Sequence, residues 1–246
     1  MRKFKVLEEI VGVSVVDWLM GDEGWKFNPE RDGCTREPLY GFTHLRQLYY
    51  KADPNYTGRF TVPVLWDKKH ETIVNNESED IMRIFNSGFD SMLPVRGLDY
   101  YPPEKRQEIN QVNQCIYDGL NNGVYRAGFA TNQDIYEEAA KQVFESLRRI
   151  EVILGKQKCV VGEEITEADV RLFTTLVRFD PVYFGHFKCN LLAVKDCPNI
   201  LRWMRQIYPL VEDTVNMVHI KHHYYESHKQ INPTGIVPLS NGPQLI

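Results

Sequence analysis

The stretch TVPVLWDKKHETIVNNESEDI combines a proline inside an apolar run with an acidic residue and a serine at a predicted helix start. A cis Val62–Pro63 bond at a strand start would expose the N–H and C=O of Val62, which can then pair with a peptide-like ligand as an added strand. Farther along, Glu77 suits an ammonium group, while Ser78 and the first N–H groups of the helix suit a carboxylate. Together these residues match a γ-glutamyl amino-acid end and the adjacent cysteinyl backbone.

Each half of this pattern also has a purely structural interpretation. Val62–Pro63 can be an ordinary X-Pro turn, and Glu77 with Ser78 can be an ordinary helix start. Because both halves occur together at this spacing, the pattern favours a ligand site over two unrelated structural features.

Apolar spacing predicts the elements that would position these residues. Residues 3–16 combine helical spacing with a β-branched end, which predicts the tail of a helix that leads into a strand. After a long loop, residues 44–52 predict a short helix. Two apolar runs within residues 58–76 predict a β-hairpin, and residues 78–89 predict a helix. This order matches the second half of a thioredoxin-like layout.

The second half of the chain is predicted to be all-helical. Pro103 is well placed to open its first helix, and Thr166 with Asp169 predicts a capping box. Two apolar stripes at helical spacing follow this start. The first comprises Ile109, Val112, Ile116 and Leu120, and the second comprises Ile135, Ala139, Val143, Leu147 and Ile150. We therefore expect an α/β thioredoxin-like domain over residues 1–98 and an all-α domain over residues 99–246.

The composition of the chain argues against several classes of protein. With 43% apolar and 25% charged residues it matches an ordinary globular protein. A net charge of -4 gives no basic patch for nucleic acid, and no apolar run approaches the ~20 residues that cross a membrane. Five cysteines without CxxC spacing favour free thiols in a reducing compartment, which indicates a cytoplasmic protein.

Three histidines near the C-terminus do not predict a metal site. His222 and His223 are adjacent, so they point apart on a helix, and no acidic or cysteine residue has the spacing to complete a tetrahedral set with His228. We expect no bound metal.

Four blocks of the sequence resemble the glutathionyl-hydroquinone reductases, which are the Xi class of glutathione transferases and are also grouped with the omega-like thiol transferases. The blocks are GRFTVPVLWDK with TIVNNES, NNGVYRAGFA, FDPVYFGHFKCN and HIKHHYYESHKQINPTGIVP. The resemblance covers essentially the whole chain. It implies a homodimer with the glutathione transferase fold, in which residues 1–98 bind glutathione as co-substrate and residues 99–246 supply a pocket for an aromatic co-substrate.

The resemblance also assigns roles to residues on the glutathione side. Val62 would pair with the cysteinyl backbone of glutathione, and Glu77 and Ser78 would hold its γ-glutamyl group. Trp25 would line the site from the long loop, and Arg59 would lie near the glycine carboxylate.

Three tyrosines match the aromatic pocket of the family, namely Tyr125, Tyr183 and Tyr224. Tyr225 would replace Tyr224 if the helix were rotated by one position. Phenols there can hydrogen-bond the oxygens of a glutathionylated quinol and stabilise the leaving group. A single tyrosine is more often a half-buried core residue, but three in matching blocks favour a functional role.

The chemistry of the family is that of a thiolate at the start of the first helix, in a CPWAH-type motif. It attacks the sulfur of a glutathionylated hydroquinone, forms a mixed disulfide and is regenerated by a second glutathione. By the resemblance, this cysteine and the first strand would precede Met1, the cysteine by about ten residues. Loss of an interior strand would leave costly unpaired backbone groups, so we expect an incomplete N-terminus rather than an inactive form.

None of the cysteines in the printed sequence matches this nucleophile. Cys34 lies in a loop without a helix start, and Cys189 falls in the helical domain. The leading hypothesis is a glutathione-dependent thiol transferase that reduces glutathionyl-hydroquinones. The alternatives are a glutathione-binding protein without catalysis and a conventional transferase that activates glutathione through a serine or tyrosine hydroxyl.

Overall fold

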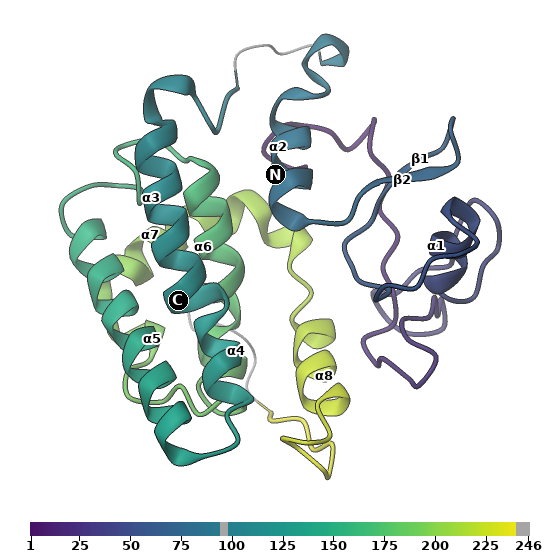
Figure 1. The fold of residues 1–246 in the computed structure, drawn as a ribbon. Helices are drawn as coiled ribbons and strands as arrows, with labels where there is room; N and C mark the ends of the chain where they lie inside the picture. Colours follow the sequence, from purple (N-terminus) through teal and green to yellow (C-terminus); the bar gives the residue numbers. More distant parts are fainter. Residues whose placement is uncertain (94–97, 240–246) are drawn as a thin grey trace. The chain divides into compact units, whose positions relative to one another are not determined.

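The computed structural model describes residues 1–93 and 98–239 and divides into two compact units (Figure 1). The N-terminal unit comprises Met1–Leu98 and Val218–Ser227. The helical unit comprises Asp99–Met217 and the segment that starts at His228. The structure thus groups Val218–Ser227 with the N-terminal unit, whereas the sequence pattern assigned it to the helical domain.

The first part of the N-terminal unit, residues 1–45, forms turns and loops rather than the predicted helix and strand. Val6 has a φ of 54°, a left-handed value that interrupts helical turns. Val13 is exposed, and among the described residues Val15 hydrogen-bonds only Thr35. β-Branched residues form a strand where a neighbouring strand supplies hydrogen bonds and packing, so the prediction for residues 3–16 is wrong for the described chain.

The remaining elements of this unit confirm the predicted short helix, hairpin and helix. They are α1 (Arg46–Ala52), β1 (Leu65–Asp67), β2 (Thr72–Asn75), α2 (Ser78–Ser87), a 3-10 helix (Asp90–Met92) and α8 (Met217–Ser227). Strands β1 and β2 pair antiparallel, with Trp66 opposite Ile73. The Val62–Pro63 bond before the hairpin is cis, which is the geometry that the ligand hypothesis requires.

An aromatic core cluster fills the N-terminal unit around α1. Its buried members are Leu45, Leu48 and Tyr49, and the partly buried side chains packed on them are Trp25, Phe27, Tyr40, Phe42, Tyr56, Phe60, Val64, Trp66 and Ile73. Aromatic side chains bury a large area each, so loops and short elements can form a core without long helices.

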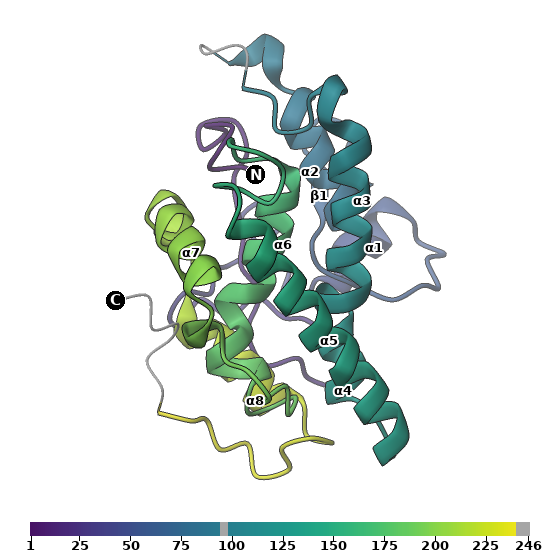
Figure 2. The ribbon, with the colours of Figure 1, turned by 90° about the vertical axis from the view of Figure 1, so that its left-hand side faces the viewer.

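The helical unit contains helices of 6 to 22 residues (Figures 1 and 2). They are α3 (Arg106–Ile116), α4 (Gly123–Gly128), α5 (Gln133–Leu154), α6 (Glu167–Arg178) and α7 (Pro198–Val211). Two π-helical turns, Tyr117–Asn121 and Phe179–Tyr183, follow α3 and α6, and 3-10 helices span Pro103–Lys105, Val194–Asp196 and Glu212–Thr214. Helix α3 contacts α6, and α5 contacts both α4 and α7.

The two predicted apolar stripes supply much of the core between these helices. Ile109, Ile116 and Leu120 are fully buried, and the stripe on α5 is buried from Ala139 onward. Ile135, in the first turn of α5, is instead 49% exposed. Burial of such stripes removes apolar area from water and stabilises the packed helices.

The predicted capping box at the start of α6 is also confirmed, and it extends into the core. Asp169 accepts hydrogen bonds from the Thr166 N–H at 2.9 Å, the Val160 N–H at 3.0 Å and the Trp203 Nε1 at 2.9 Å. One buried carboxylate thereby links α6, α7 and the loop before α6.

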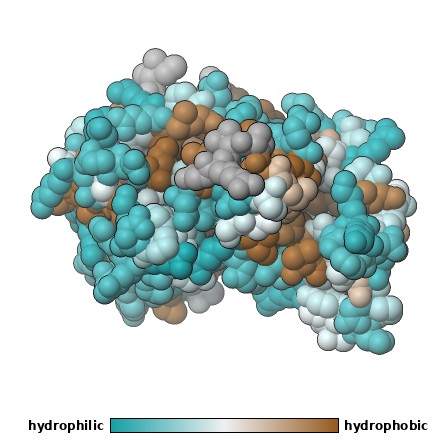
Figure 3. All heavy atoms as spheres, turned by 90° about the horizontal axis from the view of Figure 1, so that it is seen from above, coloured by the Kyte–Doolittle hydropathy of each residue, from teal (hydrophilic) through white to brown (hydrophobic). Residues whose placement is uncertain are grey.

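The polarity of the surface and the lengths of the helices agree with the composition of an ordinary globular protein. In the view of Figure 3, hydrophilic side chains cover much of the face, with apolar side chains in patches among them. Within residues 1–93 and 98–239, no helix has the length and apolar character to cross a lipid bilayer.

Candidate functional site

A hydrogen-bond network joins the two halves of the predicted glutathione site. The Tyr49 hydroxyl donates to the Thr61 C=O at 2.8 Å, and Asn76 Nδ2 donates to the Tyr49 hydroxyl at 3.1 Å and to Thr61 Oγ1 at 3.2 Å. Because Thr61 and Asn76 directly precede Val62 and Glu77, the network brings both halves into one region. Val62 is 42% exposed, and none of the described residues hydrogen-bonds its main chain.

The start of α2 leaves its first residues accessible. Glu77 is the extended N-cap residue and Ser78 the first helical residue, and both are exposed. The Glu77 N–H donates to Asn75 Oδ1 at 2.6 Å, and the Glu77 side chain makes no capping hydrogen bond. The acidic side chains of Glu79 and Asp80 have partners of their own. The Glu77 carboxylate and the Ser78 hydroxyl can therefore face a ligand.

The other two glutathione candidates lie in the same unit. Trp25 packs on the aromatic core cluster, its C=O accepts from the Leu45 N–H at 2.9 Å, and its ring centroid lies 5.3 Å from that of His223. Arg59 is exposed, and its C=O accepts from the Tyr56 hydroxyl at 2.9 Å. Trp25 thus has a structural role in the core in addition to its predicted role in glutathione binding. The main chain of Arg59 is held by a hydrogen bond, and the residue is exposed to solvent.

Tyr125 and Tyr183 meet in one aromatic cluster of the helical unit. The rings of Tyr183 and Phe187 stack with centroids 5.3 Å apart and an interplanar angle of 8°. The Tyr125 ring lies 5.2 Å from Phe187 and 6.1 Å from Tyr183, and Phe129 lies 5.5 Å from Phe187. Tyr183 is 2% exposed and Tyr125 is 36% exposed. The cluster therefore combines a buried phenol with an accessible one.

The lack of a side chain at Gly128 allows the Phe187 ring to pack against the backbone of α4. A Cβ atom at Gly128 would lie 2.1 Å from Cδ1 of Phe187, which is far inside van der Waals contact. The sequence analysis singled out the tyrosines but missed Phe129, Phe187 and Gly128, although all three lie within the quoted blocks. Their small or apolar side chains give no chemical signal in a single sequence.

The third tyrosine belongs to the other unit. Tyr224 lies on α8 within Val218–Ser227, so it is part of the N-terminal unit. Tyr224 and Tyr225 are both buried, at 4% and 7% exposure, and the Tyr224 ring lies 5.2 Å from that of His223. The structure therefore brings together two of the three predicted pocket tyrosines within one unit and leaves Tyr224 in the other.

Four thiols of the described chain are not activated. Burial raises the pKa of Cys159, Cys189 and Cys197 to about 12, so these groups stay protonated at neutral pH. Burial also raises the pKa of Cys34, which lies in the N-terminal unit. A nucleophilic thiolate needs a lowered pKa, so these four residues lack the electrostatic environment for that role.

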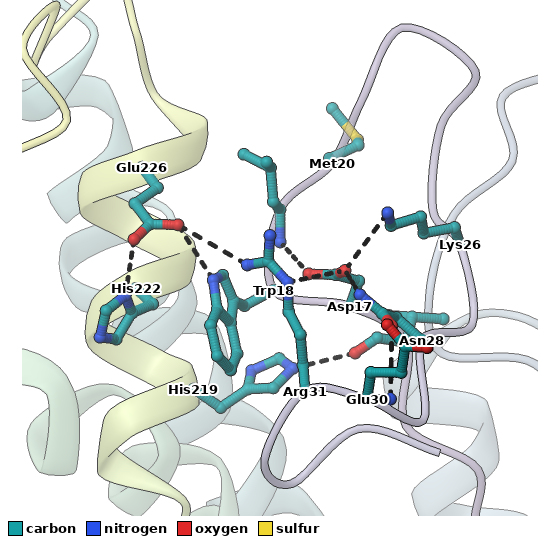
Figure 4. A network of polar contacts seen from close by, with 12 residues as sticks. Asp17, Trp18, Met20, Lys26, Asn28, Glu30, Arg31, His219, His222 and Glu226 are labelled. Carbon is teal, nitrogen blue, oxygen red and sulfur yellow. Dashed lines mark hydrogen bonds and ion pairs between the residues drawn. The ribbon is translucent and has the colours of Figure 1, made fainter. Parts of the chain in front are cut away.

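A polar network that the sequence analysis missed lies between α8 and the N-terminal loop (Figure 4). Trp18 Nε1 donates to Glu226 at 3.0 Å, and Arg31 lies over the Trp18 ring at 4.7 Å. Asp17 is fully buried and accepts from Asn28 at 2.7 Å while pairing with Arg31 at 3.2 Å. Trp18 and Glu226 are 208 positions apart in the chain, and no local sequence pattern indicates such a pairing.

Among the described residues no group of histidine, cysteine and acidic side chains could hold a metal ion.

Comparison with known proteins identifies the family. The family model of the glutathione S-transferase C-terminal domain matches residues 133–206. Glutathionyl-hydroquinone reductase YqjG of Escherichia coli is 53% identical over 241 residues, which cover 97% of this chain and 73% of that protein. The chain belongs to the glutathionyl-hydroquinone reductase family. Glutathionyl-hydroquinone reductase PcpF of Sphingobium chlorophenolicum is 50% identical, with coverage of 97% and 76%.

Solved structures of this family share the fold. The glutathione-bound structure of YqjG has a TM-score of 0.94 and covers 98% of this chain and 78% of its own. Glutathione transferase Xi 1 of Trametes versicolor also has a TM-score of 0.94, at 50% identity and coverage of 99% and 85%. The glutathione transferase fold and the Xi-class assignment expected from the sequence are thus confirmed. The roles of the individual site residues remain predictions.

Proposed function

We propose that this protein is a glutathione-dependent thiol transferase that reduces glutathionyl-hydroquinones to hydroquinones. The observation that supports the proposal is the aromatic cluster in which the accessible phenol of Tyr125 lies against the buried rings of Tyr183 and Phe187, an apolar setting with a phenol donor that suits a quinol ring. Membership in the glutathionyl-hydroquinone reductase family supports the same substrate class.

Glutathione is the proposed co-substrate, bound by the N-terminal unit. The exposed Val62 main chain beside the cis Pro63 would pair with the cysteinyl backbone. Glu77 and Ser78 would hold the γ-glutamyl ammonium and carboxylate groups. Arg59 would contact the glycine carboxylate as a mobile surface cation. A glutathione-bound structure of YqjG supports glutathione as the ligand class.

Trp25 and the three tyrosines complete the proposed site. Trp25, which packs on the aromatic core cluster, would line the glutathione region. Tyr125, Tyr183 and Tyr224 would hydrogen-bond the quinol oxygens. As the ring carbon takes up electrons, donation from these phenols stabilises the developing charge.

The proposed reaction is a two-electron reduction of a carbon–sulfur bond by two thiols. A cysteine thiolate attacks the glutathione sulfur, a sulfur–sulfur bond forms and the bond to the ring carbon breaks. The ring carbon keeps the electron pair and takes a proton, which releases the hydroquinone. A second glutathione thiolate then attacks the mixed disulfide, which yields oxidised glutathione and the free cysteine thiolate.

A second candidate function is glutathione binding without catalysis. It is favoured by the protonated state of the buried thiols, since Cys159, Cys189 and Cys197 have a pKa of about 12. Both candidates use the same glutathione site, so affinity for glutathione does not separate them.

Turnover of glutathionyl-hydroquinone separates the two candidates. The 246-residue chain would be assayed alone and after fusion to a family N-terminal segment with its first strand and Cys-Pro motif. We expect turnover only in the fusion, and its loss when the added cysteine is changed to serine. Turnover by the unfused chain would contradict the proposed thiolate mechanism, while an inactive fusion would favour the binding protein.

Single substitutions in the fusion test the tyrosines. Tyr125→Phe, Tyr183→Phe and Tyr224→Phe remove one hydroxyl each, and each should lower turnover about tenfold or more, the range of a lost transition-state hydrogen bond. Tyr225→Phe is the matched control on α8 and should leave turnover unchanged. An effect at Tyr225 instead of Tyr224 would reassign the pocket residue, and unchanged kinetics in all variants would reject the pocket.

Two further properties belong to the proposal. The protein would act as a homodimer in the cytoplasm, as expected from the resemblance and the free thiols. Sedimentation equilibrium of the chain tests the first of these, and fractionation of the source cells tests the second.

A further inference from the structure

One face of α8 carries polar side chains that the proposed function does not use. His219, His222, His223, Glu226 and Ser227 follow the spacing i, i+3, i+4, i+7 and i+8, which places them along one side of a helix. Four of these residues hydrogen-bond a single short stretch of the N-terminal loop. The fifth, His222, bonds Glu226 within the helix.

The contacts of this face with the loop are main-chain and side-chain bonds to residues 16–20. His219 Nε2 is 3.0 Å from the Val16 C=O, and His223 Nδ1 is 2.9 Å from the Trp18 C=O. Ser227 Oγ donates to the same Trp18 C=O at 2.9 Å. Together they fix both the rotation of α8 and its position along the loop.

Glu226 is the charged centre of this face (Figure 4). Its Oε2 accepts from Trp18 Nε1 at 3.0 Å and lies 3.9 Å from Arg31, and its Oε1 lies 2.6 Å from His222 Nδ1. The Trp18 ring is in turn held between Arg31, at 4.7 Å, and the His222 ring, at 4.9 Å. One carboxylate thus holds a tryptophan whose two faces are both occupied.

The buried side of α8 holds the proposed quinol residue. Tyr224 is two residues before Glu226 and 4% exposed, and its ring contacts His223, which also contacts the ring of Trp25 at 5.3 Å. Tyr224 lies on the same helix as the residues that bind the loop, so the rotation of α8 about its axis sets the position of the Tyr224 hydroxyl. Contacts that hold α8 against rotation therefore control where that hydroxyl lies.

We propose that Glu226 is a positioning residue: by binding Trp18 it holds α8 in the rotation that presents Tyr224 to the quinol part of the substrate. The inference rests on the proposed function, because it concerns the same substrate. Glu226 does not touch the substrate in this proposal, so its removal should affect recognition of the quinol and not of glutathione.

Binding measurements on the 246-residue chain test this without any turnover. Dissociation constants would be measured by calorimetry for two probes, glutathione and the glutathione thioether of 1,4-hydroquinone. Glu226→Ala should weaken binding of the thioether about tenfold, as expected when a hydrogen bond to a charged group is lost, and change glutathione binding less than about twofold. Glu226→Gln retains an acceptor for Trp18 and should restore most of the thioether affinity.

A double-mutant cycle ties the effect to Tyr224. Tyr224→Phe should weaken thioether binding in the unaltered chain but add little in the Glu226→Ala background, because the hydroxyl is already misplaced. Glu137→Ala removes a comparable exposed carboxylate that pairs with Lys141 on α5. It is the matched control and should change neither dissociation constant.

The outcomes separate this inference from the function on which it rests. Thioether binding that is unchanged in Glu226→Ala, or an equal loss for both probes, would overturn the positioning role while leaving the proposed function intact. Failure of the unaltered chain to bind the thioether would overturn the proposed function and this inference with it. Should Glu226→Ala not fold, Trp18→Phe removes the indole donor while it keeps an aromatic ring at this position, and the two outcomes for thioether and glutathione binding are interpreted in the same way.

Discussion

Asp169 in the helical unit and Glu37 in the N-terminal unit are both buried carboxylates that accept several hydrogen bonds. The donors to Asp169 are all buried and include the Trp203 indole of α7 beside the nearby Val160 and Thr166 N–H groups, and burial raises the pKa of this carboxyl above its ordinary value. Glu37 instead accepts from the N–H groups of Leu39, Tyr40 and Phe42, all within five residues. The first carboxylate joins helices, and the second organises its own loop.

This difference extends to the two units as a whole. The helical unit is held by apolar stripes and by buried polar groups such as Asp169 and the hydrogen-bonded pair of Asn113 and Glu167. The N-terminal unit combines an aromatic core cluster with polar contacts between segments, such as those of Trp18 with α8. Substitutions in the helical unit should therefore lower the stability of the whole unit, whereas substitutions in the N-terminal unit should act locally and on ligand binding.

The largest expected effect is that of Asp169→Ala. The change leaves the Trp203 indole and the Val160 and Thr166 N–H groups without their acceptor in a region that water does not reach. At about 1–3 kcal/mol for each buried donor left unpaired, the free energy of unfolding should fall by about 3 kcal/mol or more. Urea denaturation followed by circular dichroism measures this change.

Glu37→Ala is the matched substitution in the N-terminal unit. Leu39 is 42% exposed, so water can replace the lost carboxylate at part of the loop. We expect a loss of about 1 kcal/mol, with the effect confined to hydrogen exchange of the surrounding loop. Equal losses for the two variants would show that the contrast between the units is wrong.

The next effect is that of Gly128→Ala in the aromatic cluster. The new Cβ would lie 2.1 Å from a ring atom of Phe187, which is fully buried and stacked on Tyr183, so the ring must move. Overpacking of this kind costs about 1–3 kcal/mol. Thermal unfolding measures the loss of stability, and the near-ultraviolet circular dichroism of the aromatic residues reports the displaced rings.

Gly12→Ala gives the matched control in the N-terminal loop. Nothing lies within 4 Å of a Cβ placed there, so the change should alter the free energy of unfolding by less than about 0.5 kcal/mol. A large loss at Gly12, or none at Gly128, would contradict the contrast between a loosely packed N-terminal loop and a tightly packed cluster.

Periodic and capping patterns explain why the helical unit was predictable from sequence. The stripes through Ile109 and Val143 and the box of Thr166 with Asp169 are local signals, and packing and hydrogen bonding then follow them. The hairpin was also predicted, because turn chemistry acts on neighbouring residues.

Features that depend on distant partners were not predictable in this way. The β-branched run before Val16 resembles a strand in isolation, but the described residues offer it no ladder. The pairing of Trp18 with Glu226 spans 208 positions, and the loop carbonyls that His219 and His223 of α8 bind are equally distant in the chain. For the candidate site, sequence supplied the tyrosines through resemblance, while Phe187 and Gly128 required the structure.

The smallest effect concerns the thiols, and it bears on both the comparison and the mechanism. Cys159, Cys189 and Cys197 lie in the helical unit with a pKa of about 12, against an ordinary value of 9.0. Their thiolate fraction at pH 8 should therefore be about a thousandfold lower than that of an ordinary cysteine. Iodoacetamide should thus label them only after unfolding, and mass spectrometry identifies the labelled sites.

The same thiols predict a pH dependence of stability. Because unfolded thiols lose protons that the folded ones keep, the free energy of unfolding should fall as the pH rises from about 9 towards 12. Rapid labelling of these three residues in the folded protein would contradict this expectation, since it would reveal an accessible thiolate within the helical unit.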